Sequence, residues 1–180
     1  MHCRFRSLVF GVVVAFLLSG ASAPGQDAPL PLRTEFLMML SAELEESQMV
    51  GDTPLGSRRI VYVRSGAFAG PYLKGTVIPG GGDWVLLRGD GASSLDVRIT
   101  LRTDDGALIY VTYGGVSTMS PEVRRRIIDG EAVAPSEYYF RTTPRFETAS
   151  GKYAWLNKLV TVGVGQRTRM GVVYSVYAVK

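Results

Sequence analysis

Alternating apolar and polar residues identify the middle of the chain as β-sheet. Residues 95–102 alternate strictly over eight positions, which is the pattern of a strand with one buried face. Asp104-Asp105-Gly106 then leads into a second run, residues 107–113, which ends at Gly114-Gly115. Asp-Gly between two such runs favours a tight hairpin turn, and the earlier Asp90-Gly91 predicts another turn of the same antiparallel meander.

Runs of β-branched and aromatic residues continue the strand pattern on both sides of this hairpin. Further strands are expected at residues 60–63, 138–142, 145–148, 153–164 and 171–179. The last of these carries almost no polar residue on either face. Such a strand is expected to pair on both sides, in a closed barrel or within a sandwich, because an exposed apolar edge invites aggregation.

Two segments have helical features. Ser120, Pro121 and Glu122 supply a capping residue, a first-turn proline and an early acid, and they predict a short helix over residues 120–129. Residues 34–50 are rich in Leu, Met, Ala and Glu, so propensity alone predicts a second helix there.

The N-terminus has the three parts of a secretory signal peptide. Residues 1–6 are basic, an apolar run follows at residues 8–18, and small residues occupy most of 19–25. The apolar run is shorter than the ~20 residues that span a bilayer, which argues against a permanent membrane anchor. We therefore expect a signal peptide at residues 1–25, a single domain at residues 33–180, and a secreted or periplasmic protein.

Composition narrows the chemistry of the mature domain. The chain holds one His and one Cys, His2 and Cys3, and both lie in the predicted signal peptide. Removal of that peptide excludes Ser-His and Cys-His catalysis, zinc sites built from these residues, and haem or iron–sulfur ligation. We accordingly expect no metal and no cofactor.

The charge balance argues against nucleic acid as a partner. Cleavage removes two arginines and lowers the formal net charge from +4 to about +2, which is too little for a nucleic-acid footprint. The densest basic run, Arg124-Arg125-Arg126, is flanked by Glu122 and Asp129, so we interpret it as a solvated helix face. A monomer and a homo-oligomer both remain open.

A series of motifs runs through the chain from residue 80 onward. In order, they are Gly80-Gly81-Gly82-Asp83-Trp84, Asp90-Gly91, Leu95-Asp96-Val97-Arg98, residues 103–111, Tyr139-Phe140-Arg141-Thr142, residues 144–148 and Tyr153-Ala154-Trp155-Leu156-Asn157. Together they resemble a bacterial and fungal family, uncharacterised protein family 0311, also called domain of unknown function 3237. The resemblance spans about residue 33 to the C-terminus. It implies a compact antiparallel β-barrel of the lipocalin or allene-oxide-cyclase type and almost nothing about a reaction.

The resemblance also implies that the first segment is a strand. As a strand, residues 34–46 place one apolar set on a single face: Phe36, Met38, Leu40, Ala42 and Leu44. This alternation fits the apolar residues of the segment better than a helical spacing does. We therefore expect tertiary pairing to override helix propensity in this segment.

Polar residues within the family-like motifs are candidate ligand contacts, because an eight-stranded barrel is either filled by side chains or admits one small ligand. Asp96 and Arg98 share one face of their strand. That face either lies in water or lines a cavity, where the two residues would form a pair that holds a ligand oxygen. Arg141 and Glu147 are candidates for a second pair of this kind.

Aromatic and amide residues supply further candidates. Tyr153, Trp155 and Asn157 share one face of the predicted strand. They are either a wall for a flat organic ligand, with Asn157 donating to a carbonyl, or part of a buried Trp–Tyr cluster. Tyr113, beside glycines at a predicted strand end, is a candidate hydroxyl at the cavity mouth. The predicted ligand-binding set is completed by Asp83 and Trp84.

Three functions fit this architecture. The first is non-catalytic binding of a small aromatic or polyketide-like organic molecule in the barrel. The second is a cofactor-independent isomerase, cyclase or dehydratase, in which a carboxylate or Tyr moves protons and an arginine stabilises an enolate-like oxygen. The residues for these roles are Asp96, Glu147 and Tyr113, with Arg98 or Arg141. The third is a structural envelope protein with a filled barrel.

An enclosed cavity lined by Asp96, Arg98, Arg141 and Trp155 would favour the first two functions, whereas a solid apolar interior with those side chains in solvent would leave only the third. Between those two, a cavity carboxylate with a raised pKa beside a Tyr hydroxyl would favour the enzyme.

Overall fold

The computed structural model describes residues 29–180, so the predicted signal peptide lies outside the described residues. The strands are β1 Thr34–Leu44, β2 Gln48–Thr53, β3 Gly56–Ala69, β4 Lys74–Leu87, β5 Ser93–Thr103, β6 Leu108–Thr118, β7 Tyr139–Thr142, β8 Arg145–Glu147, β9 Thr161–Arg167 and β10 Gly171–Val179. The helices are α1 Pro121–Ile128 and two 3-10 helices, η1 Pro135–Glu137 and η2 Gly151–Lys158.

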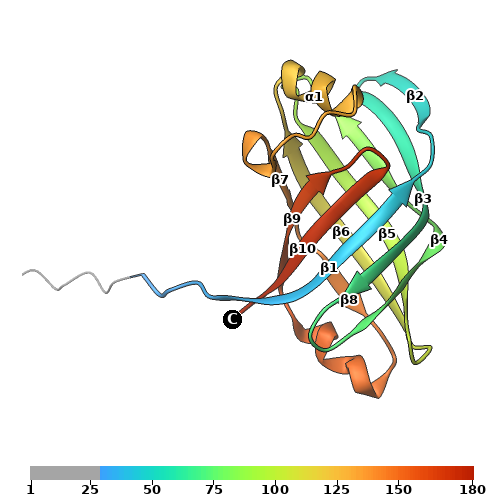
Figure 1. The fold of residues 1–180 in the computed structure, drawn as a ribbon, viewed down its shortest axis with the longest axis vertical. Coiled ribbons are helices and arrows are strands. Elements are labelled where there is room, and N and C mark those ends of the chain that lie inside the picture. The colour runs from blue at the N-terminus through green and yellow to red at the C-terminus, as the bar shows by residue number, and fades with distance from the viewer. Residues whose placement is uncertain (1–28) are drawn as a thin grey trace, which may run out of the picture. The chain divides into compact units, whose positions relative to one another are not determined.

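The strands close into an eight-stranded antiparallel β-barrel, as predicted (Figure 1). Neighbours follow the order β1-β10-β9-β7-β6-β5-β4-β3, and β1 pairs with β3 to complete the ring. The strands β7 and β8 both pair with β6, along different parts of it. The strand β2 lies outside the ring and pairs with the beginning of β3. The apolar last strand, β10, pairs with β1 and β9, which confirms the expected pairing on both sides.

The alternation along β5 sorts its side chains between the barrel interior and water. Val97, Ile99 and Leu101 are buried in the core, whereas Asp96 and Arg98 are exposed on the outer face. Of the two alternatives for this polar face, the structure therefore shows the one in water. The Asp90-Gly91 and Asp105-Gly106 turns also form as predicted, with the glycines at φ +81° and +87°.

The first segment is a strand despite its helical composition, because both of its edges find partners in β10 and β3. Met38, Leu40 and Ala42 point into the core as expected. A bulge between Phe36 and Met38 shifts the register, so Phe36 leaves the predicted inner face and is 38% exposed.

Two predicted element boundaries are wrong. Residues 151–158 form η2, so the strand predicted over 153–164 exists only from Thr161. Gly114-Gly115 does not end β6, which continues to Thr118. Gly115 instead allows close strand packing, since a Cβ there would lie 2.6 Å from the carbonyl oxygen of Arg141.

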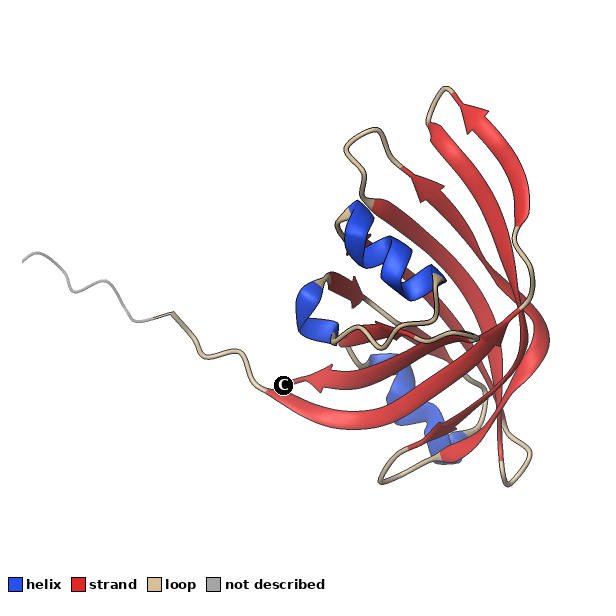
Figure 2. Cartoon of the chain, turned by 45° about the horizontal axis from the view of Figure 1, so that its top comes forward, coloured by secondary structure: helices blue, strands red, loops and turns tan. Residues whose placement is uncertain are grey.

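The helices lie at the ends of the barrel. Figure 1 shows α1 and β2 at one end and η2, in orange, at the other, and Figure 2 shows α1 lying across the barrel opening. Ser120 caps α1 as predicted, since its Oγ accepts a hydrogen bond from the backbone N–H of Val123 at 3.1 Å. No helix within residues 29–180 is long and apolar enough to cross a membrane.

Candidate functional site at the barrel mouth

A cavity of about 380 Å³ opens at the end of the barrel that carries α1. We call it the mouth cavity. Its walls come from the end of β1, from β3, from α1 and from the turn between β9 and β10. Large apolar and cationic side chains supply much of its lining: Leu44, Arg59, Met119, Arg124, Ile127, Ile128, Arg167 and Met170.

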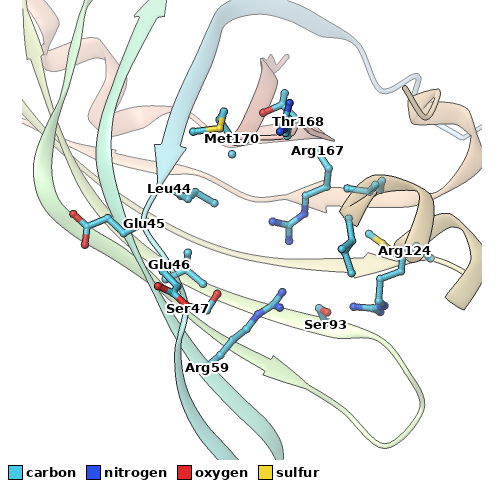
Figure 3. Close-up of a pocket in the computed structure, with 16 residues that line it drawn as sticks. Leu44, Glu45, Glu46, Ser47, Arg59, Ser93, Arg124, Arg167, Thr168 and Met170 are labelled. Atoms are coloured by element: carbon cyan, nitrogen blue, oxygen red, sulfur yellow. The ribbon is translucent and has the colours of Figure 1, made fainter. Parts of the chain in front are cut away.

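Strand register explains why two arginines point into this cavity. Arg59 on β3 lies opposite Val85, and Arg167 on β9 lies opposite Val172; both valines are buried. Residues directly opposite each other in an antiparallel pair share a face, so both arginines face the interior. Arg124 reaches the same cavity from α1, and Figure 3 shows the three guanidinium groups around one space.

None of these three arginines forms an ion pair within residues 29–180. Burial lowers the pKa of Arg59, and the neighbouring charges of Arg167 and Arg124 lower it further. Lowering of this kind shows that Arg59 is poorly solvated and lies among like charges. Four arginines and two glutamates, Glu45 and Glu46, line the mouth cavity, so the charge of its lining is positive, and Arg59, Arg124 and Arg167 are not ion-paired with either glutamate.

Aromatic residues hold Arg167 in place. Its guanidinium carbon lies 5.1 Å from the centroid of the Phe140 ring, a cation–π contact. The backbone N–H of Arg167 donates to the hydroxyl of Tyr138 at 2.9 Å. Gly165 makes room for the Phe140 ring, since a Cβ there would lie 2.6 Å from the ring.

A second, much smaller cavity of about 20 Å³ lies inside the barrel, and we call it the deep cavity. Arg59 and Arg167 line both cavities, while Asp83, Tyr113 and Tyr174 line the deep cavity alone. Asp83 faces inward because it pairs with the buried Val61 and Val97. The rings of Tyr113 and Tyr174 pack edge to face, with centroids 5.6 Å apart.

Burial controls ionisation in the deep cavity. Burial raises the pKa of Asp83 to about 6. A backbone hydrogen bond from Asp96 (N···O 3.0 Å) and the charges of Arg167 and Arg59 act in the opposite direction and lower this pKa. Burial also raises the pKa of Tyr174 to about 12 and that of Tyr113 well above its usual range. Asp83 can therefore gain or lose a proton near neutral pH, while both tyrosines remain neutral hydroxyls.

Two of the residues predicted from sequence, Asp83 and Tyr113, meet in this site. Tyr113 faces the interior from the middle of β6, so the position predicted for it, at a strand end on the cavity rim, is wrong. Asp96 and Arg98 do form the predicted pair, at 3.0 Å, with side chains that are 56% and 50% exposed on the outer surface. Trp84 lies on that outer surface, with the guanidinium carbon of Arg98 5.5 Å from its ring centroid.

The other predicted residues lie elsewhere. Arg141 and Glu147 are exposed and form no ion pair with each other; the Arg141 guanidinium stacks on Tyr139 at 5.0 Å. Tyr153, Trp155 and Asn157 do not share the face of a strand, because they belong to η2 at the opposite end of the barrel.

Within η2 these residues make structural contacts. Asn157 exchanges two hydrogen bonds of 2.9 Å with the backbone of Thr148, and the Tyr153 hydroxyl donates to Asp105. Trp155 packs edge to face against Tyr72, with centroids 6.2 Å apart.

Sequence reasoning missed Arg59, Arg124, Arg167 and Tyr174. Arg59 shares strand parity with the buried Val61 and Val63, and a charge at a core-facing position is a signal that could have found it. The arginine run on α1 is not solvated as a whole, contrary to its interpretation from sequence. In the structure Arg125 is exposed, Arg126 pairs with two glutamates, and Arg124 turns to the mouth cavity.

Known proteins are similar to this chain in both sequence and fold. A UPF0311 protein of Clostridium acetobutylicum is 34% identical over 146 residues, 81% of this chain and 92% of that protein. A UPF0311 protein of Rhodopseudomonas palustris is 34% identical over 148 residues, 82% of this chain and 97% of that protein.

Solved structures give the same result. The crystal structure of a conserved protein of unknown function from R. palustris superposes with a TM-score of 0.80 at 33% identity and covers 84% of this chain and all of that chain. A β-barrel-like protein from Acinetobacter baumannii gives a TM-score of 0.74 at 38% identity and covers 86% of this chain and all of that chain.

An enzyme from Penicillium herquei shares the fold at a TM-score of 0.66 with 22% identity, covering 86% of this chain and 99% of that chain. The sequence family described as "Protein of unknown function (DUF3237)" matches residues 32–179. That match covers most of the chain and agrees with the relatives above. The chain therefore belongs to this family, uncharacterised protein family 0311.

Proposed function

We propose that the protein binds a small organic anion in the mouth cavity, with the acidic group of the ligand on Arg59, Arg124 and Arg167. The observation that carries this proposal is the convergence of three guanidinium groups that have no ion-pair partner among the described residues. Poorly solvated cations are costly unless they are paired. A carboxylate or enolate would pair with them through charge-assisted, bidentate hydrogen bonds.

The size of the cavity supports a small ligand. Its volume of about 380 Å³ lies at the lower end of the ~300–1,000 Å³ typical of small-molecule sites. Such a volume accommodates an aromatic acid of one or two rings or a short aliphatic acid.

Calorimetric titration tests this proposal with benzoate, phenylacetate and octanoate, each compared with its neutral primary amide. We expect saturable binding of the acids and none of the amides. Arg167→Gln should weaken acid binding by at least about tenfold, because a hydrogen-bonded charge contact is lost. The matched control is Arg141→Gln, which changes an exposed arginine stacked on Tyr139 and should leave the affinity unchanged. Equal binding of acids and amides, no binding of any acid, or an unaltered Arg167→Gln variant would overturn the proposal.

A second candidate function, cofactor-independent proton transfer, is favoured by the deep cavity. Asp83 has a pKa of about 6 and shares this cavity with the neutral Tyr113 hydroxyl and with two arginines. A base of this kind can act through one water molecule in the deep cavity and take a proton from the carbon beside the carbonyl of a substrate in the mouth cavity, while the C–H electrons move onto the carbonyl oxygen. Arg59 and Arg167 would stabilise that oxyanion. Return of the proton to another carbon completes an isomerisation without oxidant or cofactor.

In this second candidate Asp83 takes the role that the sequence suggested for Asp96 or Glu147, both of which lie on the outer surface. The test is proton NMR in D₂O with 2-oxo-4-phenylbutanoate as probe. Protein-dependent exchange of its C3 hydrogens for deuterium is expected. Asp83→Asn should abolish the exchange and leave binding of the acid intact. Exchange that persists in this variant would exclude Asp83 as the base.

A further inference from the structure

We infer that the ligand of the mouth cavity is an amphiphilic acid that enters with its acidic group first and keeps its apolar body beneath α1. This inference rests on the proposed anion binding at the same arginines and adds the chemical class and orientation of the ligand. The inference follows from the arrangement of cationic and apolar residues between the inner end of the cavity and its opening.

The cationic part of the cavity lies on its inner side. Arg59 and Arg167 line both the mouth cavity and the deep cavity, so they mark the boundary between the two. The deep cavity beyond them measures about 20 Å³. That volume is close to the space needed by one water molecule, so an apolar body cannot pass the arginines.

Apolar side chains form part of the outer lining of the cavity, beside the charged Glu45, Glu46 and Arg169, and we call this part the apolar wall. Ile128 at the end of α1 is 76% exposed, and Met170 in the turn between β9 and β10 is 55% exposed, yet both line the mouth cavity. Met119 and Ile127 continue this wall towards the core, against which both are packed. Segments far apart in sequence thus bring four large apolar side chains to the lining of the same cavity.

This wall is suited to a flexible or variable apolar body. Single exposed apolar residues are ordinary on a protein surface, but exposed side chains that continue inward as one wall offer apolar area to a ligand. Methionine adapts its shape to different partners, and Met119 and Met170 supply half of the wall. An acid whose carboxylate reaches the arginines would lay its hydrocarbon part along these residues.

The experiment is calorimetric titration of straight-chain carboxylates from butanoate to decanoate, each below its micelle concentration, with the matching primary alcohols as neutral controls. Affinity should rise by about threefold for each added methylene, as expected for hydrocarbon removed from water, until the cavity is filled. The alcohols should bind at least about tenfold more weakly than the acids of equal length, because they lack the charge that pairs with the arginines.

Two variants locate the apolar body. Ile128→Ser and Met170→Ser should each weaken decanoate severalfold and leave butanoate unchanged, because only the longer chain reaches them. The control is Val160→Ser, which removes an apolar side chain that is 70% exposed between η2 and β9 and should change neither affinity.

The outcomes separate this inference from the proposed function. Acids that depend on Arg167 but bind with an affinity independent of chain length would overturn the amphiphile and leave anion binding in place. Normal binding of decanoate by both serine variants would have the same consequence. Failure of every acid to bind, or acid binding that is indifferent to Arg167→Gln, would overturn both.

Discussion

The two ends of the barrel place an aspartate in opposite surroundings, one exposed and the other largely buried. At the η2 end, Asp105 accepts hydrogen bonds from Lys152, Thr103 and Tyr153, and these partners hold its pKa well below the usual range. At the mouth end, Asp83 accepts one hydrogen bond within residues 29–180, from the backbone of Asp96, and burial raises its pKa. The residue type is the same, and the difference lies in the surroundings: Asp105 is exposed and bonded to three side chains, whereas Asp83 is largely removed from water.

The arginines show the same contrast within a single helix. Arg126 of α1 pairs with Glu131 at 3.0 Å and Glu137 at 2.6 Å, and so ties the segment after α1 to the helix. Arg124, two residues earlier, has no such partner among the described residues and lines the mouth cavity. Charges that are satisfied within the chain stabilise the fold, whereas charges that face a cavity without partners are available to a ligand.

The largest expected effect comes from replacing one arginine of the mouth cavity by a carboxylate. Arg167→Glu would place a carboxylate beside Arg59, whose pKa already responds to the charge at position 167. We expect the affinity for octanoate to fall by about a hundredfold, because one cation is lost and another becomes paired. Calorimetric titration measures this effect, and Arg141→Glu is the control for a charge reversal outside the cavity. Retained affinity in Arg167→Glu would show that acids bind elsewhere.

Removing the charge of Asp83 should stabilise the fold. Its pKa is higher in the folded protein, about 6, than the ordinary value of 3.8. Ionisation of Asp83 therefore lowers the free energy of unfolding, and this loss grows as the pH rises from 3.8 through 6. Asp83→Asn, which can still accept the Asp96 hydrogen bond, should raise the free energy of unfolding by about 2 kcal/mol at pH 7.5.

Urea unfolding of wild type and Asp83→Asn at pH 7.5 and at pH 3.5 measures this difference. At pH 3.5 the carboxyl is largely protonated in both states, so the stabilisation should nearly disappear. A variant less stable than wild type at pH 7.5 would mean that the pairing of Asp83 with the arginines outweighs its burial.

The elements that could be predicted from sequence are those defined by local pattern. The alternation in β5, the Asp-Gly turns and the capped helix α1 depend on neighbours a few residues apart. The strand β1 is predictable only through the family resemblance, since its pairing with β10 and β3 joins distant parts of the chain. The aromatic residues of η2 and the β-branched residues that follow it suggest one continuous strand, but the hydrogen bonds between Asn157 and Thr148 hold η2 in a different backbone conformation.

The candidate site was predictable only in part for the same reason. Asp83 and Tyr113 lie within recognisable motifs, whereas Arg59 and Arg167 acquire a shared environment only when β3 and β9 become parts of one closed barrel. Trp155 and Asn157 have residue types suited to ligand binding, but their position follows from η2, which the pattern did not predict.

A smaller effect is expected from the partnered end of the barrel. Tyr153→Phe removes the hydroxyl that donates to Asp105 at 3.1 Å but keeps the buried ring. The free energy of unfolding should fall by about 1 kcal/mol, the net contribution of one hydrogen bond. Octanoate affinity should not change, because η2 lies at the opposite end from the mouth cavity. Altered affinity with unchanged stability would instead support the ligand-wall role predicted for this residue.

The smallest expected effect links the ionisation of Asp83 to binding. Between pH 7.5 and 5.5 octanoate stays mostly ionised, Arg59 remains charged and the buried tyrosines remain neutral, while Asp83 titrates about its pKa of 6. Protonation removes the negative charge closest to the arginines of the deep cavity. The affinity for octanoate should therefore rise on the order of threefold from pH 7.5 to 5.5.

Asp83→Asn is the matched control for this last effect, because it carries no charge at either pH. Its affinity should equal that of wild type at pH 5.5 and should stay there at pH 7.5. A second control is Asp104→Asn, which removes an exposed carboxylate that is paired with Lys74 at 3.3 Å and should preserve the wild-type dependence. An Asp83→Asn variant that retains the full pH dependence would assign that dependence to another group. It would also remove the distinction between an exposed, paired aspartate and a largely buried one, on which the comparison of the two barrel ends depends.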